Sequence, residues 1–313
     1  MKKVKLECWW TNSGLLTERF LRSFVPKEDL DEYEFVFENQ DYTIVFGRTD
    51  FDNIPTDKEK TFYLSQEPLW SPNQPKNSLY EYFNKAIISD KSLFEDKEEY
   101  VETLLPMFYA GHGNYDYNND EFDWRYEMKD FEFNKTKPFS IICTSNYHSW
   151  ADELQIPGKT KSLYKTRCDL STKLSKNSNI DVYGYHWEPN GKNIIGEIWN
   201  KRVGLNEYKF SLCSENTIQK NYVSEKFWDA VLTETVPVYL GCNNIHDYIP
   251  EDLFINLTPY SHDIDLMEQK VNEIVDNHEE LYNIYRPKVL KLKEMYFNDP
   301  RFNLWLKIKE LIS

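Results

Sequence analysis

The sequence predicts an α/β fold with two domains, each built around a parallel β-sheet with helices beside it. The length of 313 residues suits two domains of ordinary size. Short apolar runs of strand length alternate with segments of helical spacing along most of the chain. Residues 208–241 follow the order strand, polar loop, helix, strand, and the strands of such a βαβ unit are parallel.

In the first half of the chain, predicted strands and helices alternate. We expect strands at residues 4–10, 33–37, 42–46, 60–64 and 86–89, and helices at residues 17–23 and 97–105. The segment after residue 64, SQEPLWSPNQP, contains three prolines and therefore predicts a loop at the carboxyl end of a strand. Residues 110–137 are mostly polar and lack an apolar period, which indicates either a flexible loop or a loop that lines a site.

The second half begins after a basic, proline-containing segment at residues 134–138, which we interpret as the crossover between domains. Besides the elements of residues 208–241, we expect strands at 139–144, 180–183 and 253–257, and helices at 161–174, 264–283 and 302–312. The predicted boundaries are therefore residues 1–134 for the first domain, 135–300 for the second and 301–313 for a C-terminal helix.

The stretch at residues 208–241 places polar side chains where a parallel sheet binds ligands. Its first strand is expected at 208–213, its helix at 222–232 and its second strand at 235–241. Ligands of such sheets sit beyond the carboxyl ends of the strands. Five polar residues fall there, namely Glu215, Asn216, Tyr222, Glu225 and Lys226. A helix N-terminus with a lysine beside it suits a phosphate, because the free N–H groups and the helix dipole both favour an anion.

The composition argues against several functions. With 37 basic and 52 acidic residues the net charge is −15, whereas nucleic-acid binding needs clustered lysine and arginine. No apolar run reaches the length of about 18 residues that a transmembrane helix needs. The N-terminal segment MKKVKLECWW is too short for the core of a signal peptide. We therefore expect a cytoplasmic protein without a membrane anchor.

No metal site is expected from the sequence. The five cysteines lack metal-ligand spacing and fit buried free thiols in a reducing compartment; they are Cys8, Cys143, Cys168, Cys213 and Cys242. Aspartate pairs of the D-x-D type begin at residues 29, 50 and 263, but none follows a convincing strand, and acid-rich chains contain such pairs by chance. The six histidines show no ligand spacing.

The stretch at residues 208–241 resembles the signature of the α-1,3/4-fucosyltransferases, glycosyltransferase family 10. The matching residues are Tyr208, Lys209, Phe210, Glu215, Asn216, Thr217, Tyr222, Val223, Ser224, Glu225, Lys226, Val236, Pro237, Val238 and Gly241. Asn221 replaces the usual acid, and Thr235 replaces a frequent glycine. The resemblance is strong over this stretch, weaker over residues 139–260 and thin before residue 130.

The resemblance implies a GT-B fold, in which two Rossmann-like domains face each other across a cleft. The first domain would bind the acceptor and the second the nucleotide-sugar donor. In GT-B proteins the last helix often crosses back to the first domain, and residues 304–312 are the candidate here. Because no membrane anchor is expected, the chain resembles the soluble bacterial or viral members of the family.

In the implied donor site, Lys226 is the candidate ligand of the diphosphate, since its charge and the helix dipole act together on an anion. Glu225 is expected at the ribose hydroxyls, because a carboxylate beside a diphosphate is unfavourable; the resemblance implies the same role. The resemblance also suggests that Asn216 and Tyr222 contact the donor. Glu215 could bind the fucose hydroxyls, the ribose or only the backbone of its loop.

Three further candidate donor ligands lie outside this stretch. Family members show a Ser-Asn strand end followed by a helix with an arginine, and Asn146 and Arg167 match that pattern. Arg167 would present a bidentate fork to a phosphate, with an ion pair on the helix face as the alternative. Lys192 lies near the place where the family has a second basic phosphate ligand.

Glu67 is the candidate catalytic base. It lies in the loop after the predicted strand at 60–64, where the family has a glutamate followed closely by proline. An inverting transfer needs one base, because the acceptor hydroxyl attacks directly and no enzyme-bound sugar forms. Trp70 and Trp150 are candidate acceptor platforms, since an aromatic face can stack on a sugar ring; packing in the core is the alternative.

The sequence thus predicts an inverting fucosyltransferase of the hexosyltransferase class. It would move fucose from GDP-fucose to a hydroxyl of an N-acetylglucosamine-type or glucose-type glycan, forming an α-1,3 link without a cofactor or a metal ion. Two alternatives are a GT-B transferase that uses another nucleotide sugar and a non-catalytic sugar-binding relative. Diphosphate and ribose occur in most nucleotide sugars, so the donor residues alone do not select GDP-fucose. An intact Glu67 together with Lys226 and Glu225 argues against a non-catalytic protein.

Overall fold

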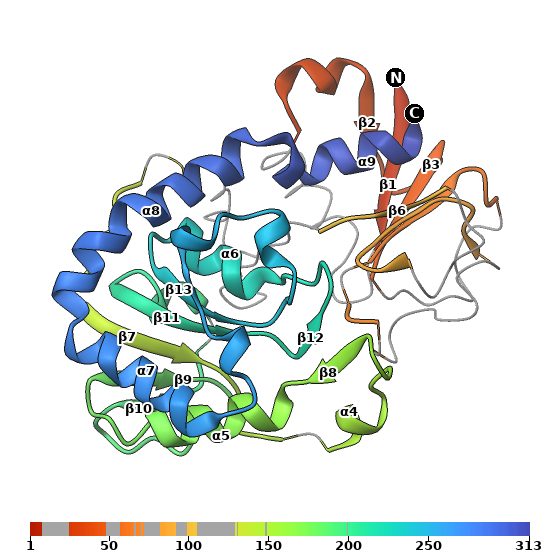
Figure 1. The fold of residues 1–313 in the computed structure, drawn as a ribbon. Coiled ribbons are helices and arrows are strands. Elements are labelled where there is room, and N and C mark those ends of the chain that lie inside the picture. The colour runs from red at the N-terminus through yellow and green to blue at the C-terminus, as the bar shows by residue number, and fades with distance from the viewer. Residues whose placement is uncertain are drawn as a thin grey trace. The chain divides into compact units, whose positions relative to one another are not determined.

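The structure is a computed structural model of the chain. It describes residues 1–7, 25–47, 57–65, 67–69, 71, 82–91, 99–104, 129, 131–147, 149–198 and 200–313. The chain forms two compact units (Figure 1): unit 1 comprises Met1–Pro106 and Asp299–Ser313, and unit 2 comprises Met107–Asn298. Each unit contains a parallel sheet, in agreement with the predicted α/β fold. The assignment of acceptor and donor binding to residues 1–134 and 135–300 stays a prediction.

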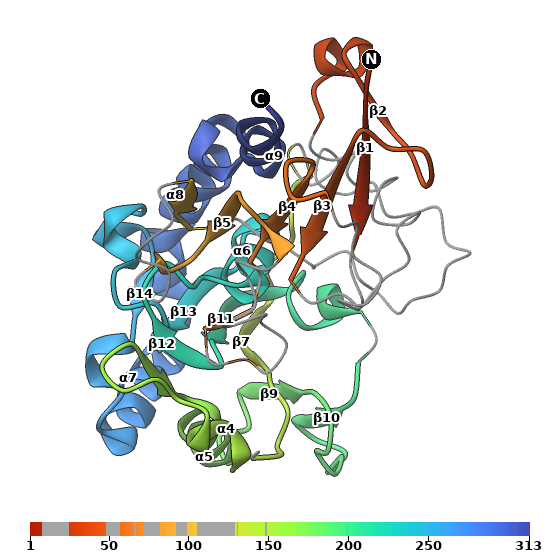
Figure 2. The same ribbon diagram turned by 90° about the vertical axis from the view of Figure 1, so that its right-hand side faces the viewer.

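The sheet of unit 1 has the strand order β2-β1-β3-β4-β5-β6, and neighbouring strands are parallel. The strands are β1 (Lys2–Glu7), β2 (Tyr33–Phe35), β3 (Tyr42–Phe46), β4 (Thr61–Leu64), β5 (Ala86–Ile88) and β6 (Tyr100–Glu102). Figure 2 shows β1, β3 and β4 side by side. Both β4 and β5 are buried along their whole length, as expected for apolar runs within a parallel sheet.

The prediction of a helix at residues 97–105 is wrong. Strand β6 lies within this segment and pairs with β5, with Ala86 opposite Tyr100. The Tyr100 ring is buried, and its hydroxyl donates a hydrogen bond to the Phe83 carbonyl at 3.0 Å. Strand pairing and this anchor therefore override the local helical preference. The helix expected at residues 17–23 lies outside the described residues.

The C-terminal helix packs within unit 1, as the sequence suggested for residues 304–312. It comprises the short 3₁₀ helix η8 (Pro300–Phe302) and α9 (Leu304–Ile312), and α9 contacts β5. The buried Trp305 indole donates a hydrogen bond to Asp29 Oδ2 at 2.6 Å, and Lys309 Nζ donates to Asp29 Oδ1 at 2.8 Å. Asp29 belongs to the 3₁₀ helix η1 (Lys27–Asp31), so one carboxylate links η1 to α9.

Replacing Asp29 by alanine should lower the free energy of unfolding by about 1–3 kcal/mol, because two hydrogen bonds to a charged acceptor are lost. Burial raises the pKa of Asp29, but the bonds from Lys309 and Trp305 hold it below its ordinary value. Urea unfolding measures the effect. Asp31→Ala, which removes an exposed carboxylate of the same 3₁₀ helix, is the control, and an equal loss in both variants would contradict the role of Asp29.

The sheet of unit 2 has the strand order β10-β9-β7-β11-β13-β14, and its strands are also parallel. The strands are β7 (Lys137–Ile142), β9 (Ile180–Tyr183), β10 (Ile194–Gly196), β11 (Tyr208–Ser214), β13 (Val236–Leu240) and β14 (Ile255–Asn256). The central strand β11 is buried at every position and lies between β7 and β13. The carboxyl ends of β7 and β11 therefore lie next to each other.

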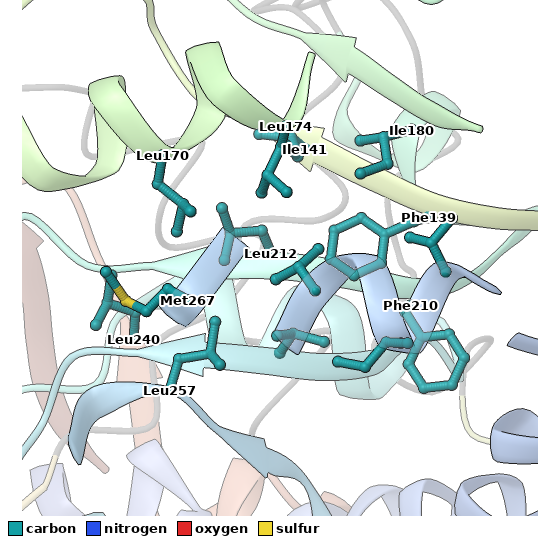
Figure 3. Packing of buried hydrophobic residues seen from close by; sticks show 14 of the residues in the cluster. Phe139, Ile141, Leu170, Leu174, Ile180, Phe210, Leu212, Leu240, Leu257 and Met267 are labelled. Atoms are coloured by element: carbon teal, nitrogen blue, oxygen red, sulfur yellow. The ribbon is translucent and has the colours of Figure 1, made fainter. Parts of the chain in front are cut away.

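One core of unit 2 lies between its sheet and three of its helices (Figure 3). The helices of unit 2 are α4 (Trp150–Glu153), α5 (Tyr164–Leu174), α6 (Glu225–Leu232), α7 (Ile264–Asp276) and α8 (His278–Asn298). Side chains of α5, α7 and α8 meet those of β7, β11 and β13 in this core. The remaining short 3₁₀ helices are η4 (Lys201–Gly204), η5 (Ile245–Asp247), η6 (Glu251–Leu253) and η7 (Thr258–Tyr260).

Several predicted boundaries in unit 2 need correction. The segment at 214–221 is not entirely loop, because β12 (Thr217–Gln219) pairs antiparallel with β8 (Thr160–Ser162). The same pairing delays the start of α5 to Tyr164. Strand β10 is absent from the prediction, and the helix expected at 264–283 is two helices that meet near Asn277.

Candidate functional site

The candidate site of unit 2 lies where β7 and β11 end and α6 begins. Helix α6 starts after Ser224, whose extended backbone and side-chain oxygen form the N-cap by accepting a hydrogen bond from the Lys226 N–H. The predicted start of this helix at residue 222 is therefore three residues early. Glu225 and Lys226 occupy the first turn of α6, where the helix dipole favours anions.

Glu215, directly after β11, fastens this helix start to the sheet. Its side chain is fully buried, and its two oxygens accept hydrogen bonds from the Ser224 N–H at 2.7 Å and the Ser224 hydroxyl at 2.6 Å. Burial raises the pKa of Glu215, and the charge of Lys226 opposes this shift. Among the three roles left open by the sequence, these contacts correspond to holding the loop backbone.

Gly241 leaves room for that carboxylate. A Cβ at position 241 would lie 2.4 Å from Glu215 Cγ and 2.5 Å from the Tyr239 hydroxyl oxygen. The glycine that ends the signature is therefore needed for packing against Glu215, which explains its position without a role in binding.

Lys226 and Lys201 share the carboxylate of Glu225. The Glu225 Oε1 atom lies 3.2 Å from Lys226 Nζ and 3.0 Å from Lys201 Nζ. Lys201, in η4, also lies 3.2 Å from Oδ2 of the buried Asp229. Burial raises the pKa of Glu225, but the two lysines outweigh it and hold this pKa well below its ordinary value. Lys226 Nζ further contacts the Ser224 hydroxyl at 3.1 Å and lies 3.8 Å from Glu215 Oε2.

Lys201 is a site residue that sequence reasoning missed. It precedes Glu225 by 24 residues in a short 3₁₀ helix, and no local motif marks it. Only the fold of unit 2 brings its ammonium group beside the first turn of α6. The structure thus adds Lys201 as a second cation beside the signature residues Glu225 and Lys226.

Replacing Lys201 by methionine should reduce the free energy of unfolding by about 2–4 kcal/mol, because the buried Asp229 loses its cation. Glu225 stabilises the fold above the pKa that it has when unfolded, and this contribution disappears as the pH falls through its lower pKa in the folded chain. The difference in unfolding free energy between the wild type and the variant should therefore become smaller below about pH 4. Urea unfolding at several pH values tests this, with Lys176→Met at an exposed lysine as the control.

Arg167 is buried beside Asn216 and lacks a carboxylate partner among the described residues. Its Nη1 atom donates a hydrogen bond to Asn216 Oδ1 at 2.5 Å, and its guanidinium lies 4.4 Å from the centre of the Tyr164 ring. Its Nε atom has no hydrogen-bond partner within the described part of the chain. The sequence alternative of an ion pair on the helix face is therefore not what the structure shows for these residues.

Tyr222 and Asn221 shape the loop before α6. Tyr222 is buried, and its carbonyl accepts a hydrogen bond from the Tyr239 hydroxyl at 3.4 Å. Asn221 has a positive φ of 55°, and its Oδ1 accepts hydrogen bonds from Asn244 Nδ2 at 2.8 Å and from the Tyr248 hydroxyl at 2.7 Å.

Asparagine tolerates this left-handed conformation, and its amide oxygen can accept two hydrogen bonds. Asn221 can therefore occupy the position where the family usually has an acid.

The other predicted site residues are divided between the two units. Asn146 and Lys192 are exposed, and Trp150 begins α4 with 46% of its surface exposed. The backbone carbonyl of Asn146 contacts the Sγ atom of Cys168, the residue after Arg167, at 3.4 Å. Glu67 lies in unit 1 after β4, where its carbonyl accepts a hydrogen bond from Ser65. Trp70 lies outside the described residues.

The described residues contain neither a cluster of metal-ligand side chains nor a membrane-spanning helix. They contain no group of three or more histidine, cysteine, aspartate or glutamate side chains arranged to hold a metal ion. None of their helices combines the length and apolarity that crossing a membrane requires.

Comparison with protein families supports the resemblance of the second half. Residues 158–298 match the model described as glycosyltransferase family 10 (fucosyltransferase) C-terminal. Human 4-galactosyl-N-acetylglucosaminide 3-alpha-L-fucosyltransferase 9 is 36% identical over 140 residues, which cover 44% of this chain and 36% of the relative. Alpha-(1,3)-fucosyltransferase B of Drosophila melanogaster is 29% identical over 143 residues, covering 42% and 31%. The matched region thus spans about a third of these relatives.

Solved structures share the fold of the whole chain. An alpha1,3-fucosyltransferase with GDP has a TM-score of 0.54 at 17% identity and covers 97% of this chain and 92% of its own. Anabaena Alr3699/HepE in complex with UDP-glucose has a TM-score of 0.53 at 10% identity, covering 100% and 98%. At such identities the likeness concerns the fold alone, which is GT-B, as predicted.

Proposed function

We propose that the protein is a fucosyltransferase of glycosyltransferase family 10, whose C-terminal model residues 158–298 match, and that it transfers fucose from GDP-fucose to a glycan hydroxyl. The observation that carries the proposal is the arrangement around the family signature: Glu225 and Lys226 lie in the first turn of α6, and the buried Arg167 donates a hydrogen bond to Asn216. The acceptor is an N-acetylglucosamine-type or glucose-type sugar, and the new link is α-1,3.

In the proposed donor site, the diphosphate binds at the N-terminus of α6. The free N–H groups of the first turn, the Lys226 ammonium and the Arg167 guanidinium all favour an anion there. Because Arg167 has no carboxylate among the described residues, its charge is available for a phosphate. Asn216 keeps the guanidinium in place, and Tyr222 completes the loop around the donor.

Glu225 binds the ribose in this proposal. Its Oε1 atom receives both lysines, whereas no hydrogen bond to Oε2 occurs within the described residues. Oε2 can therefore accept a hydrogen bond from a ribose hydroxyl. When Lys226 moves to the diphosphate, Lys201 continues to neutralise Glu225, so donor binding does not leave this partly buried carboxylate without a cation.

The transfer itself needs a base and a stabilised leaving group. Glu67 accepts the proton of the acceptor hydroxyl as that oxygen attacks the anomeric carbon, and the bond from this carbon to GDP breaks. Attack opposite the leaving group inverts the anomeric configuration. Lys226, Arg167 and the helix N-terminus stabilise the charge that develops on the diphosphate, so the proposed mechanism requires no metal ion.

A nucleotide screen distinguishes this proposal from a transferase that uses another donor. That alternative is relevant because Alr3699/HepE, which has a similar fold, was solved in complex with UDP-glucose. GDP should raise the melting temperature more than UDP, CMP or ADP at equal concentration, because a ligand stabilises the folded state that binds it. A larger shift with any other nucleotide would reject the fucosyl assignment.

A further inference from the structure

Two thiols meet inside the proposed donor cluster. Cys143 follows β7 directly, and Cys168 lies on α5 next to Arg167. Both thiols contact the Thr144 carbonyl oxygen, Cys143 Sγ at 3.2 Å and Cys168 Sγ at 3.5 Å. The sulfur atoms therefore come from different elements but share one small region at the carboxyl end of the sheet.

Their surroundings favour oxidation at Cys143. Cys143 is partly exposed, whereas Cys168 is buried. The neighbouring Cys168 thiol lowers the pKa of Cys143 against the effect of burial, and the charge of Arg167 adds to this lowering. The thiolate is the reactive form of cysteine. By contrast, burial raises the pKa of Cys242 to about 12 and also raises that of Cys213.

We propose that Cys143 and Cys168 form a reversible disulfide and so make the donor cluster a site of oxidative modification by peroxides. In the first step, the Cys143 thiolate attacks one oxygen of the peroxide, the O–O bond breaks, and Cys143 becomes a sulfenic acid as hydroxide or alkoxide leaves. In the second step, the Cys168 sulfur attacks the Cys143 sulfur and loses its proton, and the sulfenic oxygen leaves as water. Two thiols are oxidised and one peroxide is reduced.

The disulfide would act on the residues that surround it. A disulfide brings two sulfurs to about 2.05 Å, which is closer than two thiols that are not bonded can approach. The bond therefore pulls the turn of α5 that carries Arg167 toward the end of β7. It also removes both S–H donors from the loop at residues 144–146, whose Asn146 carbonyl contacts Cys168 Sγ at 3.4 Å. Displacement of Arg167 should weaken diphosphate binding, a consequence that rests on the proposed function.

The experiment has two independent readouts on the wild-type chain. After treatment with hydrogen peroxide and blocking of free thiols, peptide mass spectrometry should find a cross-link between residues 143 and 168 that dithiothreitol reverses. Calorimetric titration with GDP should show at least a tenfold higher Kd for the oxidised protein than for the reduced protein. Cys143→Ser should lose both responses. Cys242→Ser should keep both, since a serine hydroxyl can replace the hydrogen bond from Cys242 Sγ to Asn244 Oδ1.

The outcomes separate the inference from the proposed function. Sulfinic or sulfonic acid at Cys143 without a cross-link, or a cross-link to any other cysteine, would overturn the modification site. A 143–168 cross-link with unchanged GDP affinity would overturn its effect on donor binding. Reduced wild-type protein that fails to bind GDP would reject the donor assignment, while the mass-spectrometric result would still decide the disulfide.

Discussion

Replacing Lys226 by alanine is expected to raise the Kd for GDP by about tenfold or more, the scale of a lost charge-assisted hydrogen bond. The ammonium group stands in the first turn of α6, 3.2 Å from Glu225 and 3.1 Å from the Ser224 hydroxyl. Without it, the diphosphate loses a cation and meets the charge of Glu225 more directly. Calorimetric titration with GDP measures the change.

Two further variants make this test specific. Lys226→Arg keeps the positive charge and should recover part of the affinity, whereas Lys176→Ala removes an exposed lysine of unit 2 and should leave the Kd unchanged. Wild-type affinity in Lys226→Ala, with an intact fold by circular dichroism, would remove the phosphate role from this lysine.

Replacing Glu67 by glutamine should reduce the rate of fucose transfer by about 100-fold or more and leave the Kd for GDP unchanged, because the amide accepts no proton from the acceptor hydroxyl. The transfer rate is followed by GDP release with acceptor present, and the Kd by calorimetry. Glu38→Gln, at an exposed glutamate between β2 and β3, should affect neither quantity. Wild-type turnover in Glu67→Gln would exclude this residue as the base.

Strands that consist of a continuous apolar run were the most predictable parts of the fold. Strand β9 has the predicted bounds, as does β3, and β11 differs from its prediction by one residue. These segments are buried, and their sequence pattern reports that burial directly. Short strands were missed because their pairing depends on distant partners: β12 pairs with β8, far earlier in the chain, and β6 owes its form to β5.

The candidate site was predictable to the extent that its residues are adjacent in sequence. Glu225 and Lys226 carry the pattern of a helix N-terminus, and the structure places both in the first turn of α6. Lys201 carries no such pattern, and its contact with Glu225 depends on how η4 folds beside α6. The role of Glu215 was not predictable from the sequence, although the residue itself belongs to the signature. A sequence motif does not distinguish a carboxylate that faces a ligand from one that is buried under a helix cap.

The central claim is tested most directly by incubating the protein with GDP-fucose and an acceptor that contains N-acetylglucosamine or glucose, and by determining the product by NMR. We predict a fucosylated product with an α-1,3 link, whose anomeric configuration is inverted relative to the donor, together with an equal amount of GDP. A product of retained configuration, or transfer from another nucleotide sugar but not from GDP-fucose, would contradict the claim.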